Sequence, residues 1–97
     1  MSRKIVAAYT KDPEAVLDFT LDWSQIIPPG DSILSADVLV TGDDSTLVTA
    51  SDTHTTNTHV IWLSGGTEGK SYYVTSEITT TQGRHDLRTF SVAIVKT

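Results

Sequence analysis

The stretch from Ser64 to Lys96 constrains the fold more than any other part of this chain. It opens with the glycine-rich segment Ser64–Gly69 and continues with two runs in which apolar and polar residues alternate, separated by the turn Gln82-Gly83-Arg84. Because successive side chains of a β-strand point to opposite faces of a sheet, this period of two predicts two long strands joined as a hairpin. The remaining strands must then pack against this hairpin.

One face of the predicted hairpin is expected to be buried. The strand from Tyr72 to Thr81 and the strand from Leu87 to Val95 each place apolar side chains at alternate positions. The residues expected on the inner face are Tyr72, Val74, Ser76, Ile78, Phe90, Val92 and Ile94. Tyr72 follows the Gly69 corner at the spacing of a tyrosine corner, so we expect its hydroxyl to bond back to the backbone of that corner.

Upstream of the hairpin, the alternation of Leu17, Phe19, Leu21 and Trp23 with acidic residues and threonine favours a strand from Val16 to Asp22. The competing reading is a helix that begins at Asp12, with a proline in its first position. We favour the strand. The Pro28-Pro29-Gly30 turn ends this part of the chain.

Three further strands are predicted between Gly30 and the hairpin. The first is Ile33–Thr41, with one face formed by Leu34, Ala36, Val38 and Val40. After a turn at Gly42–Ser45, a short strand is expected at Thr46–Ala50, followed by a loop at Ser51–Thr55. The next strand is Thr56–Leu63. Its inner residues are either Ile61 and Leu63 or Val60 and Trp62; we favour the first pair, which places His59 on the inner side or at its boundary.

These elements predict an all-β fold of about seven strands, specifically an immunoglobulin-like or fibronectin-like β-sandwich. The length of 97 residues allows one domain. We assign residues 1–11 to an N-terminal arm or edge strand and residues 12–97 to a single sandwich domain. The absence of cysteine excludes disulfides and thiolate zinc sites.

Acidic residues are concentrated in the first two thirds of the chain. From Asp12 to Gly69 there are ten acidic side chains and no Lys or Arg, whereas Lys70 onward carries four basic and two acidic residues. Such an acidic surface repels phosphate groups, so we expect no nucleic-acid binding. No apolar stretch approaches the length of a membrane-spanning helix, and we expect no membrane partner.

No motif for catalysis, a metal or a cofactor is found. On a strand, His54 and His59 would fall on opposite faces, and Asp43 and Asp44 lack the spacing of a calcium loop. The serines lie in no nucleophile-elbow context, and the glycine-rich segment lacks the lysine of a phosphate-binding loop. We therefore predict a protein that is not an enzyme and holds no cofactor or metal.

Candidate partner-binding residues are Trp62, Arg84, Asp86 and Arg88. The last three alternate along one strand face, and they form either a cross-strand ion-pair ladder with Glu77 or a patch that faces a partner. Trp62 is a candidate aromatic anchor for such a patch, because exposed tryptophans often concentrate binding energy.

Several short segments, in this order, resemble the small tail proteins of bacteriophages and prophages known as fibre-tail adaptors. The segments are Lys11–Asp18 followed by Asp22-Trp23-Ser24, then Ile61–Gly66, Gly69-x-x-Tyr72-x-Val74-Thr75, Ile78-Thr79-Thr80 and Gly83-Arg84-x-Asp86-x-Arg88. The region from Leu39 to Thr58 does not take part in the resemblance.

The resemblance implies a non-enzymatic, immunoglobulin-like module of a virion, assembled in the host bacterial cytoplasm. Its expected partners are other phage tail or fibre proteins in a symmetric assembly, with a monomer in isolation. In this reading Trp23 fills the core, Gly65 and Gly66 form a corner, and Tyr72 closes it. The alternative is a glycan- or receptor-binding sandwich in which Trp62, Tyr9 or Tyr73 stacks on a sugar ring.

Overall fold

The computed structural model describes residues 5–96, and within them the chain forms seven β-strands in two sheets. Residues 1–4 of the predicted N-terminal arm lie outside the described residues. In chain order the strands are β1 (Ile5–Lys11), β2 (Leu17–Asp22), β3 (Ile33–Gly42), β4 (Leu47–His54), β5 (Thr58–Gly65), β6 (Ser71–Thr80) and β7 (His85–Ile94). The prediction of an all-β chain of about seven strands is confirmed.

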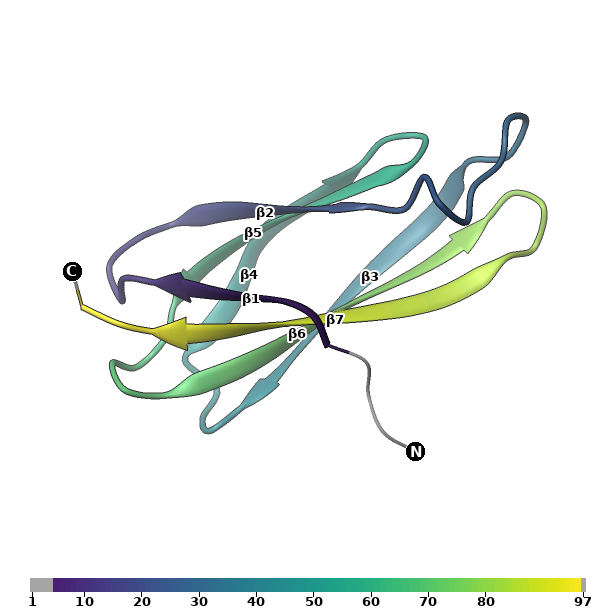
Figure 1. Cartoon of the computed structure of the whole chain (residues 1–97). Coiled ribbons are helices and arrows are strands. Elements are labelled where there is room, and N and C mark those ends of the chain that lie inside the picture. The colour runs from purple at the N-terminus through teal and green to yellow at the C-terminus, as the bar shows by residue number, and fades with distance from the viewer. Residues whose placement is uncertain (1–4, 97) are drawn as a thin grey trace.

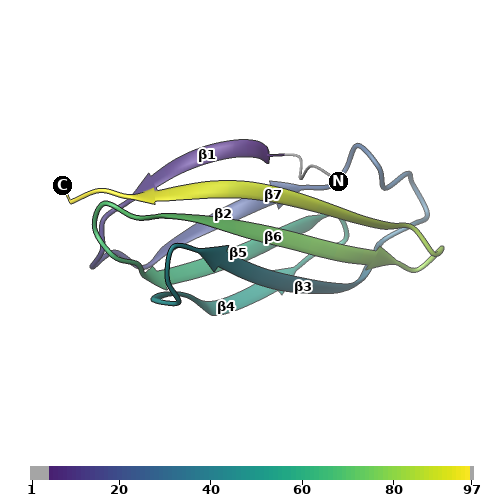
Figure 2. The same ribbon diagram turned by 90° about the horizontal axis from the view of Figure 1, so that it is seen from below.

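The two sheets lie face to face as two layers (Figures 1 and 2). One has four strands in the order β1-β7-β6-β3, and the other has three in the order β2-β5-β4. β1 runs parallel to β7, while the other strand pairs are antiparallel. The strands β6 and β7 form the predicted hairpin, with a turn at residues 81–83.

The core lies between the sheets and is built from the alternate residues that the sequence pattern indicates. Its buried hydrophobic members are Phe19, Leu21, Trp23, Ile27, Ile33, Leu47, Ile61, Leu63, Tyr72, Val74, Ile78, Phe90, Val92 and Ile94. The favoured orientation of β5 is confirmed, since Ile61 and Leu63 are buried and the Trp62 side chain faces outward. Among the described residues, Ser76 and His59 are also fully buried.

Two details of the predicted strands are wrong. The register between β3 and β6 shifts between Ile33 and Ser35, so Leu34 turns outward and is 62% exposed. β4 continues to His54, where the sequence predicts a loop, because the residues from Ser51 to His54 pair with β5 after a register shift between Thr49 and Ser51. The favoured strand after Asp12 is confirmed by β2, and in place of the competing helix the Ala15 N–H donates to the Asp12 carbonyl in a turn.

Gly65 allows the chain to turn at the end of β5. Its φ angle of 81° lies in the left-handed region, and a Cβ atom there would run into the carbonyl oxygen of Thr46. Gly83, in the hairpin turn, has a φ angle of 93° but has no atom within 4 Å of the position that its Cβ would take.

The two glycines therefore give a matched pair of variants. Gly83→Ala is expected to lower the free energy of unfolding by about 1–2 kcal/mol, because alanine is strained in a left-handed backbone conformation. Gly65→Ala adds a clash with a backbone oxygen, which cannot move away cheaply, and is expected to lose more. Urea unfolding of both variants measures the difference; equal losses would contradict the close approach of Gly65 and Thr46.

Candidate functional site

Trp62, the predicted aromatic anchor, lies on the outer face of the three-stranded sheet. It is 39% exposed, and its direct cross-strand neighbours are Asp18 on β2 and Ser51 on β4. Paired residues of antiparallel strands point to the same side of a sheet, so these three side chains share the outer face. Trp62 therefore presents an accessible indole ring next to a carboxylate.

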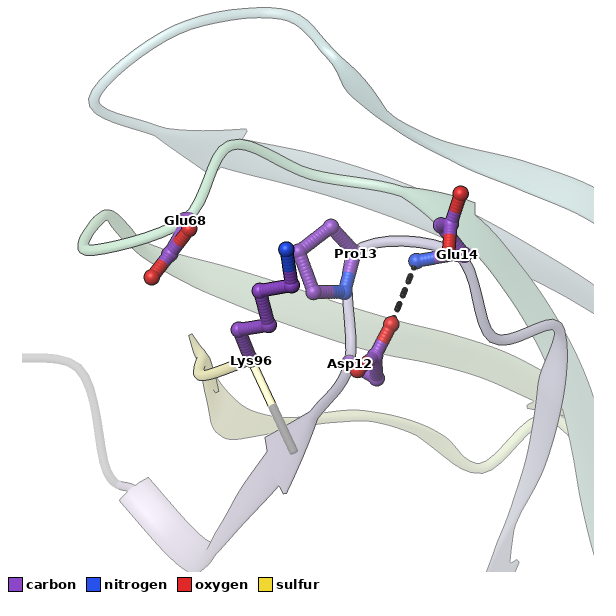
Figure 3. Close-up of a pocket in the computed structure, with 5 residues that line it drawn as sticks. All are labelled: Asp12, Pro13, Glu14, Glu68 and Lys96. Carbon is purple, nitrogen blue, oxygen red and sulfur yellow. Dashed lines mark hydrogen bonds between the residues drawn. The ribbon is translucent and has the colours of Figure 1, made fainter.

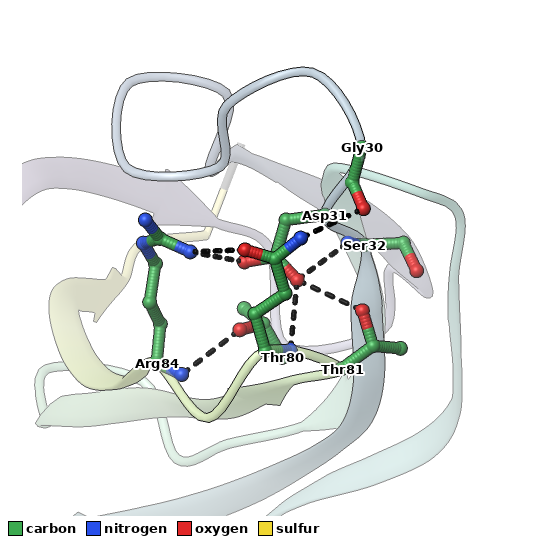
Figure 4. A network of polar contacts seen from close by, with 7 residues as sticks. Gly30, Asp31, Ser32, Thr80, Thr81 and Arg84 are labelled. Carbon is green, nitrogen blue, oxygen red and sulfur yellow. Dashed lines mark hydrogen bonds and ion pairs between the residues drawn. The ribbon is translucent and has the colours of Figure 1, made fainter.

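Arg84 is engaged by the neighbouring loop. Its Nη1 donates to Asp31 Oδ2 at 2.8 Å, and the same nitrogen lies 3.4 Å from Gln82 Oε1. The Asp31 carboxylate is inaccessible to solvent and also accepts bonds from Ser32 N, Gln82 N and Thr81 Oγ1 (Figure 4). This network joins the loop between β2 and β3 to the tip of the β6–β7 hairpin.

The charge of Asp31 is stabilised by these contacts. Burial of its carboxylate acts to raise the pKa, but hydrogen bonds from threonine hydroxyls and from the backbone N–H groups of Ser32 and Gln82 outweigh burial and hold the pKa well below its ordinary value. The carboxylate is therefore ionised at neutral pH, as its partner Arg84 requires.

Asp86 and Arg88 also make contacts within the chain. The Arg88 guanidinium carbon lies 4.2 Å from the centroid of the Trp23 ring, and its Nη1 donates to the Asp22 carbonyl at 2.7 Å. Asp86 Oδ1 accepts the N–H of Leu87 at 2.8 Å. Arg88 thus covers one end of the core, on the inner side of the four-stranded sheet.

The predicted ion-pair ladder with Glu77 is wrong. Glu77 Oε2 lies 2.6 Å from His85 Nε2, and in the β6–β7 register it faces Leu87. The predicted arginines lie on the inner side of β7 and at the hairpin tip, away from the outer face of the other sheet that carries Trp62. The structure therefore does not bring Trp62 and the arginines together.

A hydrogen-bonded chain of polar side chains crosses the core. Asp52 Oδ2 lies 2.9 Å from His59 Nε2, and His59 Nδ1 lies 2.7 Å from Ser76 Oγ. The Trp23 indole N–H also donates to Ser76 Oγ, at 3.4 Å. These residues come from both sheets and from the segment after β2, so the chain ties the two layers together.

The order Asp–His–Ser in this chain is that of a hydrolase triad, but its geometry suits packing. A nucleophilic serine must reach a substrate, whereas Ser76 and His59 are each 0% exposed and the Ser76 hydroxyl is already held by two partners. The expected separation of His54 and His59 is wrong: the β4–β5 hairpin pairs them in register, with His54 exposed and His59 buried.

Tyr72 closes the corner between β5 and β6, as predicted. Its Oη accepts the N–H of Thr67 at 2.9 Å and donates to Asp44 Oδ1 at 2.6 Å. The Asp44 carboxylate also accepts the Thr46 hydroxyl at 2.6 Å. Hydrogen bonds from Thr46, first, and then from Tyr72 hold the pKa of Asp44 well below its ordinary value.

Lys11, at the end of β1, is a buried lysine. It is 2% exposed, and its Nζ donates to the backbone carbonyls of Asp12 at 2.9 Å and Gly65 at 2.8 Å. Desolvation lowers the pKa of the ammonium, an effect that the nearby charge of Asp12 partly opposes. Lys11 therefore joins the first strand of one sheet to the last residue of β5 in the other.

A hollow of ≈ 300 Å³ lies near the same end of the molecule. It is lined by Asp12, Pro13, Glu14, Glu68 and Lys96 (Figure 3). The Glu14 N–H donates to Asp12 Oδ1 at 2.8 Å, which shapes the turn before β2. The charged residues that line this hollow are three acidic residues and one lysine. Asp12 is half-buried, and the other three are exposed.

Within residues 5–96, no group of three or more His, Asp or Glu side chains is arranged to hold a metal ion. Over the same range, no helix has the length and apolarity needed to cross a membrane.

Sequence reasoning did not find the roles of Asp31, Asp44 and Lys11, nor the link between Asp52 and Ser76. Their partners lie far away in the chain, as with Asp31 and Arg84, which are 53 positions apart. One local signal exists: Asp44 lies two residues before Thr46, a spacing at which an Asp side chain can bond the backbone of a turn.

The structure thus defines an all-β domain of two sheets. Its best-connected polar side chains make internal contacts, and Trp62 and Tyr73 are exposed on its two outer faces. The chain belongs to the family described as podophage GP4 fiber-tail adaptor protein gp77, whose model matches residues 11–93. No individual curated protein is similar enough to the chain to count as a match. The resemblance to phage fibre-tail adaptors is confirmed.

The contacts of Tyr72 give a direct test. Tyr72→Phe removes a hydroxyl that bonds Thr67 and Asp44 and is expected to lower the free energy of unfolding by about 1 kcal/mol. Tyr73→Phe removes an exposed hydroxyl with no hydrogen bond to the described residues and serves as the control. Denaturant unfolding compares the two, and an unchanged stability of Tyr72→Phe would refute the corner.

The contacts of Asp31 predict a pH dependence. Because the folded state lowers the pKa of this carboxylate below its ordinary value of 3.8, its stabilising contribution is present above that pH and is lost as the pH falls below it. Asp31→Asn should therefore be less stable than the wild type at pH 7, and the difference should shrink toward pH 2. Thermal melts between pH 2 and 7 measure this, with exposed Asp37→Asn as the charge-matched control. A difference that stayed constant with pH would contradict the network.

Proposed function

We propose that this chain is a non-enzymatic structural component of a phage virion, a fibre-tail adaptor that acts by docking other tail or fibre proteins. The observation that carries the proposal is the family match over residues 11–93. Adaptors of this kind work through the surfaces that they present, and the two outer sheet faces are the broad surfaces that this fold offers.

We infer further that the domain is of the immunoglobulin-like class. The inference is supported by the parallel pairing of β1 with β7, by the β6–β7 hairpin at the centre of the larger sheet, and by Tyr72, which closes its corner in the manner of a tyrosine corner. In this scheme residues 1–11 form an N-terminal segment whose strand β1 is the edge of the larger sheet, and residues 12–97 supply the other six strands of the sandwich.

The internal use of polar groups supports a role without catalysis. Ser76 and His59, the pair that most resembles catalytic machinery, are buried and mutually bonded. Arg84 is held by Asp31, and Arg88 is held by Trp23 and the backbone of Asp22. We therefore keep Trp62 as the leading partner-contact residue. Arg84, at the hairpin tip, and Asp86 and Arg88, on the inner side of β7, are kept as candidates of lower rank.

The alternative of a glycan-binding module is supported less well. The Tyr9 ring packs against Phe19 and Phe90, with centroids 5.0 and 5.5 Å away. Trp62 and Tyr73 lie on the outer faces of different sheets. A sugar-binding site usually gathers aromatic and polar groups in one place, and these three residues are dispersed.

In the virion we propose a symmetric assembly in which many weak contacts add up, formed from a chain that is monomeric in isolation and assembled in the host cytoplasm. Mass spectrometry of purified particles tests the proposal. The chain should be present in intact virions and missing from particles made after deletion of its gene, with loss of the fibres. Fibre-bearing particles that lack this chain would refute it.

A further inference from the structure

The outer face of the three-stranded sheet has a composition unlike that of the rest of the surface. We call it the Trp62 face and define it by the outward residues of β2, β5 and β4: Asp18, Thr20, Asp22, Thr58, Val60, Trp62, Ser64, Val48, Ser51 and Thr53. Trp62 and Val48 are exposed by 39% and 48%, and Val60 lies beside them on β5. An accessible apolar centre is thus bordered by aspartates and hydroxyl groups.

The charge of this face has one sign. β2, β4 and β5 contain no Lys or Arg, whereas the outer side of β2 carries Asp18 and Asp22. Asp22 already accepts the Ser24 N–H at 2.9 Å. Asp18 is exposed and has no hydrogen bond or ion pair with any residue between 5 and 96. Its negative charge is therefore available to a partner.

Asp18 and Trp62 are placed to act on one ligand group. They are direct cross-strand partners, so their Cβ atoms lie about 5 Å apart on the same side of the sheet. The Trp62 indole N–H likewise makes no hydrogen bond to the described residues. A cation over the indole face would meet the ring quadrupole and the carboxylate together.

The same chain already shows this kind of contact in its interior. Arg88 stacks on Trp23 at 4.2 Å and donates to the backbone oxygen of Asp22. There the arginine combines a tryptophan face with an oxygen acceptor on the neighbouring residue. The Trp62 face offers the same two elements, an indole and an oxygen acceptor, but lacks the arginine.

A second copy of this chain is a poor occupant of the Trp62 face. Docking two such faces through a twofold axis would bring aspartates toward aspartates in a surface without Lys or Arg, and like charges in contact oppose association. Charge complementarity instead selects a partner segment that carries positive charge.

We propose that the Trp62 face docks an arginine- or lysine-bearing segment of another tail protein, with the cationic side chain over the Trp62 ring and paired with Asp18. The proposal rests on the adaptor function above and adds the surface and the chemistry of the partner. Trp62 and its apolar neighbours exclude water from the contact, and Asp18 provides the charge that selects the partner.

The test uses phage particles made in a host that carries a deletion of the chromosomal or phage copy of this gene and supplies variants in trans. Wild type, Trp62→Ala, Asp18→Asn and Asp18→Arg are compared with Tyr73→Ala, an exposed aromatic on the other sheet's outer face. Circular dichroism melts first establish that each variant is folded, which is expected because all three positions are exposed.

We expect Trp62→Ala and Asp18→Arg to reduce the number of copies per particle at least about tenfold, the loss typical of a residue that anchors an interface. Asp18→Asn should give an intermediate loss, and Tyr73→Ala should match the wild type. If folded Trp62→Ala and Asp18→Arg are incorporated like the wild type, the inference is overturned while the adaptor function stands. If wild-type chain is absent from particles, the adaptor function itself fails.

The identity of the occupant is tested by a photo-reactive benzoylphenylalanine placed at position 51, the cross-strand neighbour of Trp62 on β4, in assembled particles, with the same residue at position 73 as the control. Irradiation and mass spectrometry should show position 51 cross-linked to a peptide of another tail protein that contains Lys or Arg at the cross-link. A cross-link to an acidic or uncharged segment, to a second copy of this chain, or to nothing would each overturn the proposal.

Discussion

A buried histidine must have both ring nitrogens satisfied, and in this chain that requirement holds the two sheets in register. His59 is fully buried on β5, so its partners have to come from either side of it: Asp52 from the neighbouring strand and Ser76 from the opposite sheet. No buried side-chain polar atom in the described residues lacks a hydrogen-bond partner. A slip of either sheet by one residue would turn these polar groups away from one another and leave them buried without hydrogen-bond partners. The free-energy cost of burying unpaired polar groups therefore opposes such a slip, in addition to the loss of packing.

The periodic part of the fold is readable from the sequence because it is local. Alternation along β2, β6 and β7 predicts which residues face inward, alternation along β5 leaves two possible inner faces, and the spacing of Gly69 and Tyr72 predicts the corner. Irregular pairing is not readable in this way. Leu34 faces solvent because of a register shift that depends on the partner strand, and β4 extends past Ala50 because it pairs with β5 as far as His54 and His59. A bulge breaks the period of two without leaving a residue type of its own.

The candidate site shows the same division. The alternation of β5 leaves two orientations open for Trp62, and the favoured one, with Ile61 and Leu63 inward and Trp62 outward, is the one that the structure has. Which acidic residue lies beside it depends on the pairing of β2 with β5, some 44 positions away, and no local pattern gives the neighbour Asp18. For Arg84 and Arg88 the charge pattern was visible, but their partners Asp31 and Trp23 come from the segment between β2 and β3. Long-range partners decide whether a charged side chain is free for another protein.

The parallel pairing of the first and last strands has a mechanical consequence. β1 and β7 run in the same direction along a ladder from Ile5–Thr89 to Lys11–Ile94, so the start of β1 and the end of β7 lie at opposite ends of that ladder. Tension applied through the two ends of the chain pulls these strands past each other and loads their hydrogen bonds together, in shear. An antiparallel pair of strands pulled apart from one end would instead break its hydrogen bonds one after another. Resistance to force in such a domain is governed by its unfolding rate, and this ladder, together with the Lys11 contact beside it, lies on the path along which the load would travel.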